Sequence, residues 1–200
     1  METTVAGQRA RQLPTGTLTF LFTDIQGSTT KVAELGIERW TDVLRAHARI
    51  LREAIAAGGG IGVRTEGDAF FVVFPRAQGA IEACVHAQRA LFAEPWPHGA
   101  EVRVRMGLHT GQAALGGPDT GMDYVGLDVH RAARVAAAGH GGQVLLSGAV
   151  AALIQGTLPE NVIIRDLGDH QLKDIARPER LHQLVIDGLP REFPPLRTLE

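Results

Sequence analysis

The chain has 200 residues, 44% of them hydrophobic, and its 20 basic and 22 acidic side chains give a formal net charge of −2. This length and apolar content suffice for one hydrophobic core, so we expect a single domain with irregular ends. The near-neutral charge, without a run of like charges, lacks the basic footprint of a nucleic-acid-binding protein.

Hydrophobic periodicity and turn residues predict most elements of the first half. In chain order they are a flexible segment (1–16), a buried strand (17–23), a short helix capped by Ser28 or Thr29, an amphipathic helix (38–57), two strands (61–65 and 69–74) joined by the turn Glu66-Gly67-Asp68, a helix from Pro75 to about residue 92, and strands at 102–110 and 112–115. The order β-α-β-β-α-β predicts an α/β (α+β) fold with a ferredoxin-like core.

The second half is expected to extend that core. In chain order the sequence predicts a helix (125–138) with Arg131 and Arg134 exposed on one side, a short strand (143–146), a helix (149–154), edge strands (162–165, 171–175 and 180–186), and a tail or linker (188–200). The domain itself is therefore expected to span residues 17–187.

Cysteine use and hydropathy indicate the compartment. Cys84 is the single cysteine, which excludes an internal disulfide and favours a reducing, intracellular environment. No stretch of about 18 apolar residues exists, and residues 1–14 contain no hydrophobic signal-peptide core. The sequence therefore predicts a cytoplasmic protein without a membrane span.

Two aspartates are the strongest functional signal. Asp24 follows the first buried strand, and Asp68 lies at the tip of the predicted hairpin. In the β-α-β-β order these strands are neighbours, and two converging carboxylates repel unless a cation lies between them. Hard oxygen ligands favour Mg²⁺ or Mn²⁺, and Gly27-Ser28-Thr29 opens a helix whose free N–H groups suit a phosphate. The alternatives are a capping role for Asp24 and turn chemistry for Asp68.

Other nucleotide and catalytic motifs are absent. The glycines at 58–62 follow a helix and precede a strand, which is the reverse of the dinucleotide-binding arrangement. The sequence has no Gly-Lys-Ser/Thr loop, no zinc spacing among its eight histidines, and no Gly-x-Ser-x-Gly elbow.

Four motifs carry a resemblance to a known family. FTDIQGST (22–29), RTEGDAF (64–70), MGLHTG (106–111) and DYVGLDVHRAAR (123–134) resemble, in order and spacing, the class III adenylate/guanylate cyclase catalytic domain in its bacterial, actinobacterial-like form. The resemblance covers about residues 17–185. It implies a nucleotide cyclase fold that works as a head-to-tail homodimer with active sites at the interface. It also implies that Asp24 and Asp68, helped by the backbone carbonyl of Ile25, bind two Mg²⁺ or Mn²⁺ ions.

The resemblance further implies roles for residues of the partner chain. Asp123 matches the aspartate that reads the purine, Arg134 the arginine that stabilises the α-phosphate in the transition state, and Lys173 the lysine that contacts the terminal phosphates. Two positions depart from the family pattern. Arg64 replaces the purine-reading lysine, and His130 replaces the asparagine that orients the ribose.

The expected function is a phosphorus-oxygen lyase that converts ATP, or alternatively GTP, to a 3′,5′-cyclic nucleotide and pyrophosphate, with low activity because of Arg64 and His130. The alternative is a degenerate cyclase that binds nucleotide or a partner domain without turnover. A dinucleotide-forming cyclase is disfavoured because the hairpin reads Glu66-Gly67-Asp68. The tail (188–200) resembles the exit from cyclase domains that precede regulatory domains, so fused or associated regulatory domains are expected.

Overall fold

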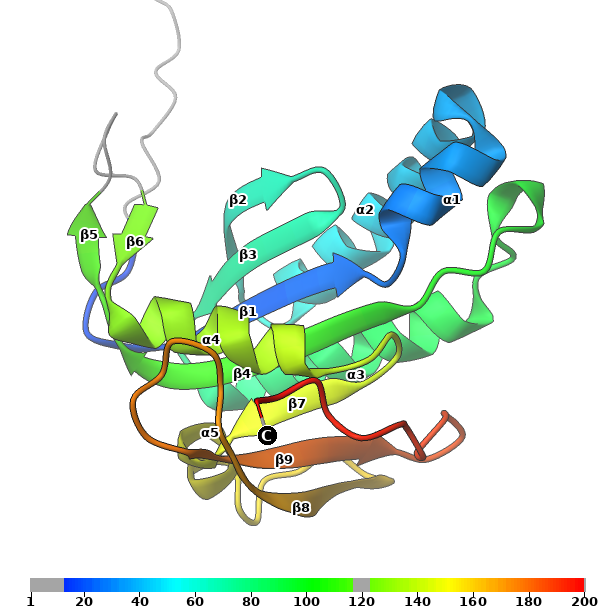
Figure 1. Ribbon diagram of the computed structural model, residues 1–200. Coiled ribbons are helices and arrows are strands. Elements are labelled where there is room, and N and C mark those ends of the chain that lie inside the picture. Colours follow the sequence, from blue (N-terminus) through cyan, green and yellow to red (C-terminus); the bar gives the residue numbers. More distant parts are fainter. Residues whose placement is uncertain (1–12, 117–122, 200) are drawn as a thin grey trace, which may run out of the picture.

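A computed structural model describes residues 13–116 and 123–199 as a twisted sheet covered by helices on both faces (Figure 1). The elements in chain order are β1 (Thr17–Ile25), α1 (Ser28–Leu35), α2 (Ile37–Ala57), β2 (Ile61–Glu66), β3 (Ala69–Phe74), α3 (Ala77–Ala93), the 3₁₀ turn η1 (Pro97–Gly99), β4 (Val104–Gln112), β5 (Ala114–Gly116), β6 (Asp123–Val125), α4 (Leu127–Ala138), β7 (Val144–Ser147), α5 (Gly148–Leu153), β8 (Val162–His170) and β9 (Glu179–Ile186). None of the described helices is long and apolar enough to cross a membrane.

The N-terminal half confirms the ferredoxin-like prediction. The seven-stranded sheet has the order β2-β3-β1-β4-β7-β9-β8, and its first four strands pair antiparallel with β1 between β3 and β4. The helices α2 and α3 lie together on one face of the sheet (Figure 1). The β1 ladder brings the end of β1 beside the start of β4, with Asp24 opposite Arg105. This register sets which side chains share the candidate site.

The C-terminal half differs from the prediction in three places. Residues 171–175 form a turn instead of a strand, in which Leu172 and Ile175 are buried and Asp174 has a φ of 61°. The strand β9 is not an edge strand, because it pairs with both β7 and β8. The strand expected at 112–115 is found as β5 (Ala114–Gly116), because β4 extends to Gln112, and β5 pairs with β6 in a separate two-stranded sheet instead of joining the main sheet.

Alternation along β1 divides the core between the two sheet faces. Leu21 and Ile25 point to the α2/α3 face, whereas Leu18 and Phe20 pack with Tyr124 and the α4 side. The helix α4 crosses only part of that second face (Figure 1). As the last even-numbered position of β1, Asp24 therefore lies on the α4 face, beyond the apolar residues.

The segment after β9 packs on the domain in an extended conformation. Leu189 contacts the α2/α3-side core, and Leu196 contacts the cluster around Leu172 and Ile175. The backbone N–H of Arg197 donates to the carbonyl of Ala138, at the end of α4, over 2.9 Å. This segment thus contributes to holding α4 in place.

Burial of His47 predicts a pH-dependent stability. Its side chain is 1% exposed against Phe70, its Nε2 atom has no hydrogen-bond partner among the described residues, and desolvation lowers its pKa from 6.5 to about 4. Between pH 6.5 and pH 4, His47 is therefore protonated in the unfolded chain but stays neutral in the folded chain. The free energy of unfolding consequently falls as the pH falls through this range. We expect His47→Leu to make the loss between pH 7 and pH 4.5 smaller by about 2 kcal/mol.

Urea denaturation at pH 7, 5.5 and 4.5 measures this effect. The matched control is the same substitution at His86, which is exposed on α3. A His47→Leu chain whose free energy of unfolding keeps the wild-type pH dependence would contradict the assignment.

Candidate active site

An open area of the sheet lies next to α4. Phe22 of β1 is half-buried and stacks on Phe71 of β3, with ring centroids 4.4 Å apart. The Arg64 guanidinium lies 5.7 Å from the centre of the Phe71 ring. Asp24 and Arg105, at the end of the same face, complete a partly exposed surface that combines aromatic rings with charge.

The structure brings the two predicted metal carboxylates together. Oδ2 of Asp68 accepts the backbone N–H of Ile25 over 2.8 Å, which ties the hairpin tip to the end of β1. Burial raises the pKa of Asp68, the nearby Asp24 carboxylate raises it further, and the Ile25 N–H opposes both. Two close carboxylates, one of them half-buried, form a site that a cation would stabilise.

The donor atoms fit a hard divalent cation. Asp24, Asp68 and the Ile25 carbonyl offer only oxygen atoms, as Mg²⁺ and Mn²⁺ prefer. No group of three or more His, Cys, Asp or Glu side chains able to hold a metal occurs in residues 13–116 and 123–199. The remaining ligands must therefore come from water or from a substrate, as is usual for Mg²⁺ at phosphate-binding sites.

Arg105 belongs to this site, although the sequence alone did not single it out. Its Nε donates to Oδ2 of Asp24 over 2.9 Å, and its Nη2 donates to the same oxygen. The alternating pattern of β4 indicates that Arg105 faces away from the α2/α3 core, but only the sheet register shows that it lies opposite Asp24.

The start of α1 follows directly after the carboxylates. Gly27 is the N-cap in the left-handed conformation (φ 71°), and no side chain of residues 13–116 and 123–199 caps the helix, so the expectation that Ser28 or Thr29 does so is wrong. The left-handed Gly27 precedes the helix, and α1 begins at the next residue, Ser28. The first N–H groups of α1, including those of Ser28 and Thr29, are therefore free of side-chain caps and suit an anion.

Arg64 and Asp123 form an ion pair within one chain. Nη1 of Arg64 donates to Asp123, and its Nε lies 2.9 Å from Oε1 of Glu66. The other Asp123 oxygen accepts the N–H of Tyr124 over 2.7 Å. The two residues expected to read the purine thus lie side by side, with Glu66 as an additional contact that the sequence did not reveal.

His130 and Arg134 lie one turn apart on α4. His130 is exposed, and Nη2 of Arg134 lies 2.5 Å from Oδ2 of Asp174. Lys173, exposed in the same turn as Asp174, is thereby placed near Arg134. Within the described part of the chain, no hydrogen bond or ion pair joins His130, Arg134 or Lys173 to Asp24 or Asp68.

A partly buried network of polar groups holds α4 against β4. Asp128 accepts hydrogen bonds from the N–H of Gln112 (2.8 Å) and Nη1 of Arg131 (2.8 Å), and lies 3.2 Å from Nε2 of His109. A side chain at Gly111 would collide with the Asp128 carboxylate. Arg131 is therefore partly buried in this network, and the prediction that it is exposed beside Arg134 is wrong.

The same network contains a Ser-His-Asp series. Nδ1 of His109 lies 2.8 Å from Oγ of Ser147, but Ser147 is 0% exposed and His109 is 3% exposed. A substrate carbonyl cannot reach this serine, so the arrangement anchors α4 and does not form a hydrolase site.

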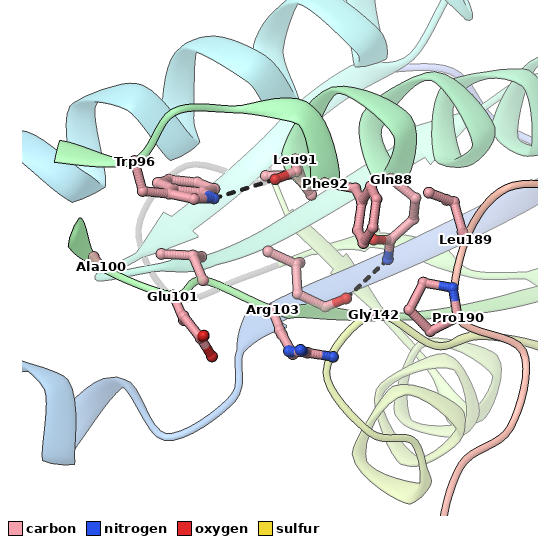
Figure 2. Close-up of a pocket in the computed structure, with 12 residues that line it drawn as sticks. Gln88, Leu91, Phe92, Trp96, Ala100, Glu101, Arg103, Gly142, Leu189 and Pro190 are labelled. Atoms are coloured by element: carbon pink, nitrogen blue, oxygen red, sulfur yellow. Dashed lines mark hydrogen bonds between the residues drawn. The ribbon is translucent and has the colours of Figure 1, made fainter.

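A separate cavity of about 200 Å³ lies on the α3 side (Figure 2). The Gln88 amide donates to the Val104 carbonyl over 2.8 Å, and the indole N–H of Trp96 donates to the Leu91 carbonyl over 3.2 Å (Figure 2). None of the site residues predicted from the sequence lines this cavity. The candidate active site is therefore the surface around Asp24 and Asp68.

A ferredoxin-like sheet that carries two converging carboxylates beside a free helix start is the arrangement expected of a metal-dependent nucleotide enzyme. The chain belongs to the adenylate and guanylate cyclase catalytic domain family, whose model matches residues 11–185. Catalytic domains of this family generally use divalent metal ions, bind a nucleotide substrate and commonly dimerise.

Individual relatives agree with the family assignment. An uncharacterized protein of Mycobacterium tuberculosis is 37% identical over 191 residues, which cover 94% of this chain and 63% of that protein. An adenylate cyclase of Mycosarcoma maydis is 38% identical over 166 residues, covering 72% of this chain and 7% of the fungal protein. The chain thus spans less than two thirds of the length of these relatives.

Solved structures match the fold. An adenylate cyclase from Trypanosoma brucei in its monomeric state superposes with a TM-score of 0.81 at 25% identity, covering 94% of this chain and 96% of the other. The adenylyl cyclase CyaB from P. aeruginosa gives a TM-score of 0.66 at 29% identity, covering 86% and 96%.

Proposed function

We propose that this domain is a nucleotidyl cyclase that converts ATP to 3′,5′-cyclic AMP and pyrophosphate at the interface of a head-to-tail homodimer. The observation that carries the proposal is the convergence of Asp24 and Asp68 at one end of the sheet, next to the free start of α1. The adenylate cyclases among its relatives support ATP as the substrate.

Asp24, Asp68 and the Ile25 carbonyl would hold two Mg²⁺ or Mn²⁺ ions. Such ions lower the pKa of the ribose 3′-hydroxyl for attack on the α-phosphate and neutralise the leaving pyrophosphate. The N–H groups of Gly27, Ser28 and Thr29 receive phosphate oxygens, because they lie at the positive end of α1. Arg105, beside Asp24, is placed to receive the polyphosphate as well.

The partner subunit completes the site. Within one chain, Arg134, His130 and Lys173 have no contact with the metal carboxylates in the described residues, which supports their acting across an interface. Exposed apolar residues near the start of α4 provide a surface for that interface that the described part of the chain leaves uncovered, namely Leu115, Val125 and Leu127 (41%, 48% and 59% exposed).

Base recognition comes from the ion-paired Arg64 and Asp123 of the partner subunit. The Asp123 carboxylate accepts a hydrogen bond from the adenine amino group, whereas the guanine carbonyl at that position would be repelled. The partner's Arg134 stabilises charge on the α-phosphate, and the partner's Lys173 contacts the terminal phosphates.

The second candidate function is a nucleotide-binding or partner-binding domain without turnover, favoured by His130 and Arg64. One preparation distinguishes the two. The purified chain is incubated with Mn²⁺ and ATP or GTP, cyclic product is measured by mass spectrometry, and nucleotide binding is measured by titration. Cyclic product supports the enzyme, whereas saturable binding without product supports the regulatory domain.

Replacing His130 tests whether it limits turnover. An asparagine at this exposed position of α4 restores an amide donor of shorter reach toward the ribose. We expect His130→Asn to raise kcat about tenfold, equivalent to roughly 1.4 kcal/mol of barrier. A lower kcat with intact dimers would show that this chain uses the imidazole itself. His86→Asn, the same substitution at an exposed position of α3, is the control and should keep the wild-type kcat.

Replacing Arg64 tests base selectivity. The wide guanidinium contacts both Asp123 and Glu66, whereas a lysine ammonium would contact Asp123 as a compact charge. Arg64→Lys is expected to raise the preference for ATP over GTP, measured as the ratio of kcat/KM values. An unchanged ratio would remove Arg64 from base recognition.

A further inference from the structure

The contact between Arg105 and Asp24 occupies one of the two metal carboxylates. Two N–H groups of the guanidinium, Nε–H and Nη2–H, donate to the same carboxylate oxygen, Oδ2. The side chains are only 21% and 33% exposed, so water screens the pair incompletely. Asp24 is the only carboxylate that pairs with Arg105 among residues 13–116 and 123–199.

A divalent cation bound to Asp24 would lie close to the guanidinium, because Arg105 already occupies Oδ2 of this carboxylate. The guanidinium and the cation carry charges of the same sign and repel each other. Each therefore binds Asp24 more weakly when the other is present. Cation binding therefore favours an Arg105 side chain that has turned away from Asp24 toward another anionic acceptor. A polyphosphate next to the start of α1 supplies oxygens that match the guanidinium fork.

We propose that Arg105 is a lock on the metal site, which weakens metal binding by the nucleotide-free chain until a triphosphate draws the guanidinium away from Asp24. This inference rests on the proposed function, because it takes Asp24 and Asp68 as the metal ligands. Metal binding and triphosphate binding are coupled through one side chain, and the coupling is reciprocal. The nucleotide-free enzyme consequently holds little metal.

The first arm of the test measures Mn²⁺ binding without nucleotide, from the loss of the free Mn²⁺ signal in electron paramagnetic resonance. Arg105→Gln is expected to bind Mn²⁺ roughly tenfold more tightly than wild type. Arg105→Lys keeps the positive charge but loses the two parallel N–H donors of the guanidinium. Its Mn²⁺ affinity is expected to lie between those of wild type and Arg105→Gln. Arg103→Gln, an exposed position two residues earlier, controls for net charge and should match wild type.

The second arm measures binding of a fluorescent ATP analogue that lacks the 3′-hydroxyl, with EDTA present. Arg105→Gln is expected to bind this triphosphate roughly tenfold more weakly, because the phosphates lose their guanidinium partner. A folding defect would weaken the binding of both Mn²⁺ and the triphosphate. If Arg105 is a lock, Arg105→Gln instead binds Mn²⁺ more tightly and the triphosphate more weakly. Mn²⁺ affinity in Arg105→Gln that equals the wild-type value would overturn the lock.

Asp68→Asn distinguishes a failure of the Arg105 lock from a failure of the proposed metal site. The lock and the proposed function both predict that Asp68→Asn loses Mn²⁺ binding. If Asp68→Asn binds Mn²⁺ as wild type does, the metal lies elsewhere and both ideas are overturned. If Asp68→Asn loses the metal while Arg105→Gln changes nothing, only the lock is overturned.

Discussion

Asp68→Asn is expected to lower the rate of cyclic nucleotide formation by roughly 1000-fold, about 4 kcal/mol of transition-state stabilisation, because one carboxylate cannot hold two cations against a triphosphate. The change should not unfold the chain. Asparagine can still accept the N–H of Ile25, and the substitution removes a half-buried charge that lies against Asp24. Activity with excess Mn²⁺ and the free energy of unfolding are measured on the same preparation.

Asp24→Asn should lose activity to a similar extent but with a different effect on stability. Its removal leaves Arg105 without its carboxylate, which costs about 1 kcal/mol or less for a partly exposed pair. Asp187→Asn, an exposed position at the end of β9, is the control and should retain wild-type turnover. Wild-type turnover in either metal-site variant would remove the two-metal assignment.

Mixing two inactive variants should restore activity. In a dimer of an Asp68→Asn chain with an Arg134→Ala chain, one of the two shared sites has both its metal carboxylates and its arginine. With random exchange half of the dimers are mixed, so about a quarter of the wild-type sites are restored. Cyclic product is measured after the two chains have been refolded together or exchanged.

The control mixture combines Asp24→Asn with Asp68→Asn. Both carboxylates belong to one chain's half of the site, so every site in every dimer of this mixture lacks at least one of them. This mixture should therefore stay inactive. Equal activities in the two mixtures, with mixed dimers shown by mass, would contradict a site built from two subunits.

The ferredoxin-like half of the fold could be predicted because its elements are long and periodic. The helix expected over 38–57 is found as Ile37–Ala57, and the hairpin strands are found at Ile61–Glu66 and Ala69–Phe74. The convergence of Asp24 and Asp68 follows from that topology, since β1 and β3 pair directly. The sequence pattern is therefore sufficient to predict the structure where local periodicity and strand order determine it.

The C-terminal half was harder because short apolar patterns are ambiguous. Leu172 and Ile175 are both buried, which a strand or a turn can achieve, and the turn is fixed by long-range packing against Ala138 and Leu145. No local signal distinguishes the two structures. The position of β9 inside the sheet also depends on a long-range contact, because β8 pairs along its outer edge.

Two site features depend on contacts between segments far apart in the sequence. Arg105 faces Asp24 because of one register between β1 and β4, and a shift by one residue would place it on the other face. Asp128 is held by groups from β4 and α4 around the close approach of Gly111. The motif that contains Gly111 could be recognised in the sequence. Only the structure shows that this motif packs against α4.

We propose that Asp24 and Asp68 hold the metal ions of a cyclase site shared by two subunits. Anomalous scattering from crystals grown with Mn²⁺ and an ATP analogue lacking the 3′-hydroxyl tests it most directly. We expect Mn²⁺ peaks between these two carboxylates and the triphosphate, with Arg134 of the partner subunit at the α-phosphate. Mn²⁺ peaks away from both carboxylates, or a nucleotide contacted by one subunit alone, would contradict it.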